Sequence, residues 1–107
     1  MTNGVRDLSK LFAALADPTR LAIVGMLVSQ ELTVLEIASS FEISQPAISR
    51  HLKVLEDAGM IERRVEGSKR PCRLIQESIE NIEAWMSMMQ KGMRQSYDRL
   101  DDVLKDM

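Results

Sequence analysis

The sequence predicts a mainly α fold with a small β-hairpin, in the element order α-α-α-α-β-β-α. Apolar residues spaced for one-sided helices fill the first half of the chain, and partly alternating residues then surround a Gly-Ser turn signal. An amphipathic stretch without proline makes up the C-terminal part. At 107 residues the chain has the usual size for one hydrophobic core, so residues 1–107 are expected to form a single domain.

The composition is ordinary for a globular protein, with 45% apolar and 28% charged residues, which excludes a disordered or collagen-like chain. No apolar run approaches the roughly 18 residues of a membrane span, and the start MTNGVRDLSK lacks the layout of a signal peptide. The single cysteine, Cys72, cannot form a disulfide within one chain, which fits a reducing compartment. These features predict a cytoplasmic protein in which Cys72 is an inert, half-buried strand residue.

Two helices are expected before residue 31. Four apolar residues with the spacing of one helix face predict the first helix: Leu8, Leu11, Phe12 and Leu15. Asp17 and Pro18 supply an N-cap and a proline at the first helical position, so the second helix should run from about Pro18 to about Gln30. Its apolar residues cover much of its circumference, which predicts the buried centre of the fold. These residues are Leu21, Ile23, Val24, Leu27 and Val28.

A short helix, a tight turn and a longer helix are expected next. Thr33 and Glu36 form a T-x-x-E capping box, so the third helix should extend from about Thr33 to Phe41. Ser44 is a favourable N-cap for the fourth helix, which should end at Gly59. The predicted buried face of the fourth helix consists of Ile48, Leu52 and Leu55.

A hairpin and a long helix complete the predicted fold. Residues 61–65 and 70–75 are expected to form two strands around a turn at 66–69, and Pro71 should confine its strand to an edge or a bulge. From about residue 77 to 107, apolar residues step by three or four positions, as along the seam of a coiled coil. The seam consists of Ile79, Ile82, Met86, Met89, Met93, Tyr97, Leu100 and Leu104.

The third helix, the fourth helix and the hairpin together predict a winged helix-turn-helix, in which the fourth helix enters the major groove of DNA. Its predicted contacts, on the face opposite the core or at its exposed first turn, are Ser44, Gln45, Pro46, Ser49, Arg50 and Lys53. Gln45 and Arg50 have the side chains that make bidentate contacts with adenine and guanine edges, whereas Lys53 suits a phosphate. Ser44 and the free amides of the helix start can hold a phosphate oxygen.

The charge distribution favours a nucleic-acid partner, although the net charge is -2. Between residues 63 and 73 five basic residues accompany a single acid, whereas from Gln76 onward seven acids accompany four bases. A basic hairpin beside a groove-reading helix can contact neighbouring phosphates. The predicted hairpin contacts are Lys69 and Arg70 near the tip and Arg73 behind them. The alternative is that the two regions are solvated faces of opposite charge.

The segments LFAALADPTRLAIVGML and SQPAISRHLKVLEDAGMIERRVEGSKRPCRL resemble the ArsR/SmtB-type winged-helix repressors over about Leu11 to Leu74. The resemblance implies a homodimeric transcriptional regulator, built through its first and last helices, that represses by binding an imperfect inverted repeat near its own promoter. It also places His51 in the recognition helix, but the helical projection turns His51 toward the flank, where it should hydrogen-bond or pack. The predicted dimer interface consists of Leu8, Leu11, Phe12, Met86, Met89, Met93, Tyr97 and Leu100.

The metal sites of this family have no counterpart in the sequence. Many relatives bind metal through two cysteines in an E-L-C-V-C-D-L segment, and the matching positions here hold Thr33 and Leu35. A second kind of family site uses histidine on the last helix, but no histidine follows His51. The chain therefore resembles the metal-free branch of the family, whose long last helix carries a Trp, here Trp85. Neither a metal nor another cofactor is predicted.

Three alternative functions were weighed against a DNA-binding repressor. One histidine, one cysteine and no Gly-rich phosphate loop argue against an enzyme. A winged helix that docks on a protein instead of DNA would agree with the acidic net charge. A repressor controlled by a small molecule could line an apolar pocket with the methionines at 86, 88, 89 and 93, although such a stripe is more often core or dimer interface.

Overall fold

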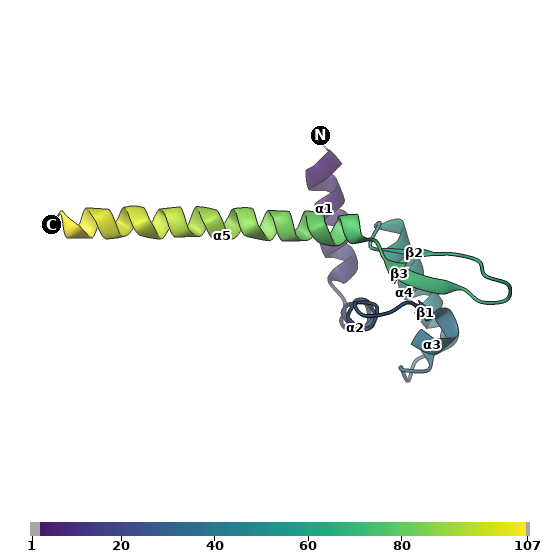
Figure 1. Ribbon diagram of the computed structural model, residues 1–107. Coiled ribbons are helices and arrows are strands. Elements are labelled where there is room, and N and C mark those ends of the chain that lie inside the picture. The colour runs from purple at the N-terminus through teal and green to yellow at the C-terminus, as the bar shows by residue number, and fades with distance from the viewer. Residues whose placement is uncertain (1–2, 107) are drawn as a thin grey trace.

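The computed structural model describes residues 3–106 and the side chains of residues 7–106. The elements in this range follow in the order α1 (Asn3–Leu15), α2 (Pro18–Met26), β1 (Leu32–Thr33), α3 (Val34–Ala38), α4 (Gln45–Asp57), β2 (Ile61–Arg63), β3 (Pro71–Leu74) and α5 (Gln76–Lys105). Figure 1 shows α1 to α4 and the strands gathered in one body, from which α5 projects. The predicted end of the last helix, Met107, lies outside the described residues.

The length of the molecule comes from α5. The chain measures 69 × 32 × 21 Å, and a helix of 30 residues accounts for about 45 Å of the longest dimension. No side chain of α5 is fully buried, which agrees with its projection away from the body in Figure 1. Among the described residues, no helix combines the length and apolar character that crossing a membrane would require.

The hydrophobic core lies between α1, α2, α3, α4 and the sheet. The predicted inward face of α4 is confirmed, because Ile48, Leu52 and Leu55 are each 0% exposed. The other members of the core cluster are Leu11, Ala14, Ile23, Leu27, Ile37, Met60, Ile61 and Cys72. The core therefore holds the inner side of α4 against the rest of the body.

The three predicted helix starts are confirmed by hydrogen bonds. The side chain of Asp17 accepts from the Arg20 N–H at 3.0 Å, and this bond lowers the pKa of the Asp17 carboxyl. Thr33 and Glu36 form the reciprocal capping box, in which the Thr33 N–H donates to Glu36 Oε1 and lowers the pKa of that carboxyl. Ser44 Oγ accepts from the Ala47 N–H at 3.3 Å and opens α4. Side-chain acceptors at these positions satisfy amides that have no partner within the helix.

The second and third helices end earlier than predicted. Helix α2 stops at Met26 instead of Gln30, because Leu27 closes it with a tight turn and the chain then extends into β1. Leu21 and Val28 are 54% and 72% exposed, so the expectation that this helix forms the buried centre is wrong. Helix α3 stops at Ala38, and short-range turn bonds continue the chain to Phe41.

The sheet has three strands instead of the two predicted. Strand β1 pairs with β3 through Leu32 opposite Cys72, so the order is β1-β3-β2 and β3 is the central strand. The expected edge position or bulge of Pro71 is therefore wrong. Pro71 is tolerated because it begins β3, and its carbonyl still accepts from the Arg64 N–H at 3.1 Å. The predicted turn is present, with Gly67 at φ 63° between the bridged residues Glu66 and Lys69.

Replacing a buried side chain of α4 should destabilise the protein strongly. We expect Leu52→Ala to lower the free energy of unfolding by about 2–5 kcal/mol, because it leaves a cavity in the core. Val54→Ala is the matched control, since Val54 lies on the same helix and is 41% exposed. Urea unfolding followed by circular dichroism measures both variants. Equal losses would contradict the assigned inward face of α4.

Candidate nucleic-acid interface

The outer face of α4 presents polar side chains to solvent. Gln45, Pro46, Arg50 and Lys53 are exposed and Ser49 is half-buried. Within residues 3–106 the Arg50 guanidinium has no hydrogen bond or ion pair, so its donors are free for a ligand. Lys53 lies 3.5 Å from Asp57 in an exposed i,i+4 pair, which is a weak interaction. These positions agree with the outward face that the helical projection predicted.

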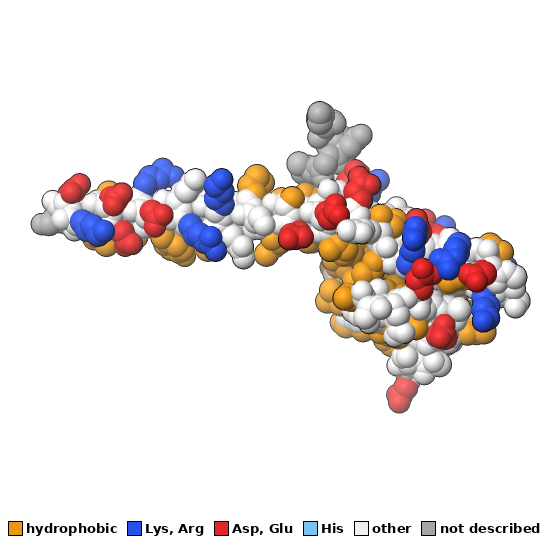
Figure 2. Space-filling view, viewed as in Figure 1, with side chains coloured by type: hydrophobic (Ala, Val, Ile, Leu, Met, Phe, Trp, Pro, Cys, Tyr) orange, Lys and Arg blue, Asp and Glu red, His pale blue; other side chains and the backbone are white. Residues whose placement is uncertain are grey.

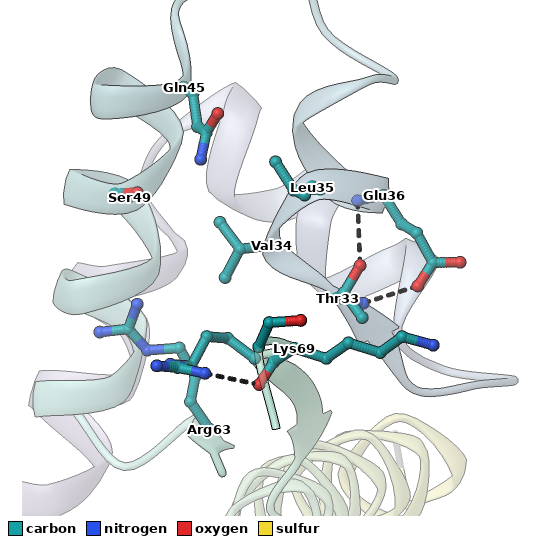
Figure 3. A pocket seen from close by; sticks show the side chains of 10 residues that line it. Thr33, Val34, Leu35, Glu36, Gln45, Ser49, Arg63 and Lys69 are labelled. Atoms are coloured by element: carbon teal, nitrogen blue, oxygen red, sulfur yellow. Dashed lines mark hydrogen bonds between the residues drawn. The ribbon is translucent and has the colours of Figure 1, made fainter. Parts of the chain in front are cut away.

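A hollow of about 680 Å³ adjoins this face and has three sides. Gln45 and Ser49 of α4 form one side, and Val34 and Leu35 of α3 form the second (Figure 3). The third side is the hairpin, which contributes Arg63, Ser68, Lys69 and Arg70. The structure thus brings the predicted residues of α4 and the hairpin to one concavity.

Helix α3 supplies a part of the hollow that the sequence analysis did not predict. Leu35 is 66% exposed and points toward the concavity, whereas an apolar residue at this position would ordinarily be assigned to the core. Its neighbour Ile37 is fully buried. Burial of Ile37 fixes the orientation of α3, and in this orientation Leu35 faces outward. No signal in the sequence distinguishes the two residues, because α3 is too short to show a helical period.

The basic residues of the hairpin fall into two groups. Three arginines pair with carboxylates: Arg63 with Glu56, Arg64 with Glu31 and Glu66, and Arg73 with Glu62. Lys69 and Arg70 have no carboxylate partner within the described part of the chain, although Arg70 donates to the carbonyls of Gly67 and Lys69. Figure 2 shows basic and acidic side chains interspersed on this part of the molecule. Of the three predicted hairpin contacts, Arg73 is therefore the one whose charge is already paired with a carboxylate.

One ion pair links α4 to the hairpin. Arg63 Nη2 donates to Glu56 Oε1 at 2.8 Å, and both side chains are partly shielded from solvent. This hydrogen bond lowers the pKa of the Glu56 carboxyl and raises the pKa of the Arg63 guanidinium. The bond fixes β2, and with it the hairpin, beside the C-terminal part of the same helix that carries Gln45 and Ser49.

His51 turns away from the outer face of α4, as the helical projection predicted. It is half-buried, and its Nδ1 lies 3.2 Å from Arg20 Nη1 and 3.9 Å from Asp17 Oδ2. The sequence analysis did not identify Arg20 as its partner, since the two residues are 31 positions apart. His51 therefore contacts the start of α2, and these contacts argue against base reading by His51.

The predicted dimer residues occupy two kinds of environment. Leu11 is 2% exposed and belongs to the core of its own protomer, so it is not available to a second copy. Phe12 is 37% exposed and packs edge-on against Trp85, with ring centroids 5.3 Å apart. The predicted dimer residues of α5 remain exposed, from 40% for Met89 to 61% for Tyr97. Figure 2 shows hydrophobic side chains along α5, interspersed with charged ones.

The residues at the positions of the family's cysteine site have other roles here. The Thr33 hydroxyl caps α3 and Leu35 lines the hollow. Cys72 is fully buried in the central strand instead of half-buried, and burial raises the pKa of its thiol. Across residues 3–106 no three His, Cys, Asp or Glu side chains gather as metal ligands would.

Helix α3, the turn, α4 and the β2–β3 hairpin define the fold class as a winged helix-turn-helix. Residues 17–63 match the bacterial regulatory proteins of the arsR family. The arsenical resistance operon repressor of Staphylococcus xylosus is 34% identical over 77 residues, which cover 72% of this chain and 74% of that protein. The HTH-type transcriptional regulator Rv2034 of Mycobacterium tuberculosis is 42% identical over 69 residues, 64% of each chain.

Solved structures agree with the sequence comparisons. The crystal structure of an ArsR family transcriptional regulator is similar with a TM-score of 0.76 at 36% identity, over 83% of this chain and 92% of the other. This chain belongs to the ArsR family of bacterial regulatory proteins. It is a DNA-binding transcriptional regulator and not an enzyme.

The link between α4 and the hairpin should make stability depend on pH. The folded pKa of Glu56 is lowered, so its ion pair contributes fully above the ordinary glutamate value, roughly 4.3, and is lost as pH falls through the folded value. We expect Glu56→Gln to be less stable than the parent at pH 7, and the difference to shrink as the pH falls toward 3. Urea unfolding at both pH values tests this, with Glu62→Gln in the exposed pair as the control. An equal loss for Glu56→Gln at both pH values would assign its effect to packing.

Proposed function

We propose that two copies of this chain bind an imperfect inverted repeat in double-stranded DNA and repress transcription from it. In this proposal α4 reads base edges in the major groove, and the hairpin tip contacts the adjacent backbone or minor groove. Binding requires no metal, because Thr33 and Leu35 replace the family's cysteine ligands. A regulator of this kind acts in the cytoplasm, where bacterial DNA lies.

The observation that carries the proposal is the hollow between α4, α3 and the hairpin. On one side Gln45 and Ser49 offer hydrogen-bonding groups suited to base edges, and on the other Lys69 and Arg70 offer cations without a carboxylate partner in the described range. Specific recognition of DNA needs both kinds of contact, since phosphate contacts position the protein and base contacts select the sequence. Arg50 extends the same surface with a free guanidinium that suits a guanine edge.

The remaining predicted contacts take supporting roles in this proposal. The Ser44 hydroxyl accepts from Ala47, which leaves its own proton free to donate to a phosphate oxygen. Lys53 can exchange its exposed pair with Asp57 for a phosphate, because that pair is weak. Pro46 lies exposed in the first turn of α4, where it can pack against the DNA backbone.

Dimerisation through α1 and α5 would place two copies of α4 on two half-sites that lie one helical turn of DNA apart, about 34 Å. The exposed apolar seam of α5 supports this arrangement, because solvation of Met86, Met93 and Leu100 is unfavourable in an isolated chain. Repression is proposed because the relative from Staphylococcus xylosus is named a repressor.

Substitutions on α4 and on the hairpin should affect DNA binding in different ways. Arg50→Ala should weaken binding to the specific site by about 1–3 kcal/mol and relax base preference, because it removes a base contact. Arg70→Ala should weaken binding to all duplexes and lower the salt slope by about 1. Fluorescence anisotropy with specific and random duplexes at several salt concentrations measures both effects. Arg94→Ala is the control that removes the same charge from α5.

If Arg50→Ala and Arg70→Ala both bind as the parent does, the assigned face is wrong and the hollow has another ligand. Circular dichroism first checks that both variants are folded, and their binding is then compared.

A charge on the seam of α5 should dissociate the dimer. We expect Met93→Glu and Leu100→Glu to give monomers with reduced operator affinity, since a buried carboxylate in an apolar interface is strongly unfavourable. Met88→Glu is the matched control, because at about 100° per residue Met88 falls on the opposite side of α5 from the seam. Sedimentation velocity measures the oligomeric state. An undisturbed dimer of both seam variants would move the interface elsewhere.

A further inference from the structure

The side chain of Arg20 joins three helices at one point. Its Nε donates to the carbonyl of Ala14 at 2.6 Å, in the last turn of α1. Its Nη1 lies 3.2 Å from Nδ1 of His51 on α4, while its own backbone N–H donates to Asp17 at the start of α2. Arg20 is half-buried. The Arg20 guanidinium therefore connects the end of α1 with the middle of α4, the helix whose outer face adjoins the hollow.

The chemistry of this contact sets the direction of the hydrogen bond. A guanidinium has donors only, so Nδ1 of His51 accepts from Arg20. Asp17 is the other charged group that the structure places near this ring, at 3.9 Å, while α1 contributes the uncharged carbonyl of Ala14.

We infer that Arg20 is a positioning residue that holds α4 in register with α1 through its contacts with Ala14 and His51, and that loss of the Arg20–His51 contact reduces selectivity for the specific DNA site. This inference rests on the proposed reading of DNA by α4. Base contacts tolerate displacements of only about half an ångström, so a contact that fixes α4 against α1 affects base reading more than phosphate binding. In the proposed dimer, α1 also lies at the interface, and Arg20 connects that interface to the reading helix.

The test compares selective with non-selective DNA binding. Dissociation constants are measured for the selected operator and for a random duplex, and their ratio, the operator preference, is the readout. The ratio removes any change in general DNA affinity that a change of charge produces.

Three variants separate positioning from folding. His51→Gln keeps an acceptor for Arg20, so its operator preference should be close to that of the parent. His51→Leu removes the acceptor and leaves the bond from Arg20 to Ala14 intact, so its preference should be about tenfold lower. Arg20→Met should resemble His51→Leu, and the double variant should be no worse than either, because both changes remove the same bond.

Several outcomes would overturn the inference. An operator preference of Arg20→Met or His51→Leu equal to that of the parent would do so. Equal operator preference of His51→Gln and His51→Leu would assign His51 a packing role. If the parent shows no operator preference, the proposed function fails instead. The positioning contact is then tested without DNA, because the imidazole nitrogen shifts of His51 should differ between the parent and Arg20→Met.

Discussion

Burial of one face of α4 is the constraint on which the proposed DNA-binding surface depends. Ile48, Leu52 and Leu55 are fully buried, and close packing around them prevents the helix from rotating without opening cavities. The polar side of α4 is held outward as a consequence. The Glu56–Arg63 ion pair then places the hairpin beside the same helix, and the capping box orients α3 on the third side of the hollow.

The local arrangement of charge explains how a chain with net charge -2 can bind DNA. Three hairpin arginines are engaged by glutamates, and the partly shielded Arg63–Glu56 pair links the hairpin to α4. Lys69 and Arg70 at the tip, together with Arg50, present positive charge where a duplex would lie. Acidic residues on α5 lie at a distance from this surface, so they lower the net charge without occupying the proposed site.

Sequence periodicity and capping residues predicted the helices because these signals are local. The starts at Asp17, Thr33 and Ser44 and the inward face of α4 required no tertiary information. Strand β1 was missed because two residues show no alternation, and its pairing with Cys72 depends on a partner 40 positions away. The exposure of Leu35, the partners of the hairpin arginines and the Arg20–His51 contact likewise arise from tertiary packing.

The central claim is that the outer face of α4 and the hairpin tip read an inverted repeat without metal. Selection of bound duplexes from a random library by the purified protein, once with chelator and once with added zinc, tests it most directly. The account predicts enrichment of the same inverted repeat in both conditions. Absence of enrichment at moderate salt would contradict DNA reading and favour a protein partner, and loss of enrichment with zinc would contradict metal independence.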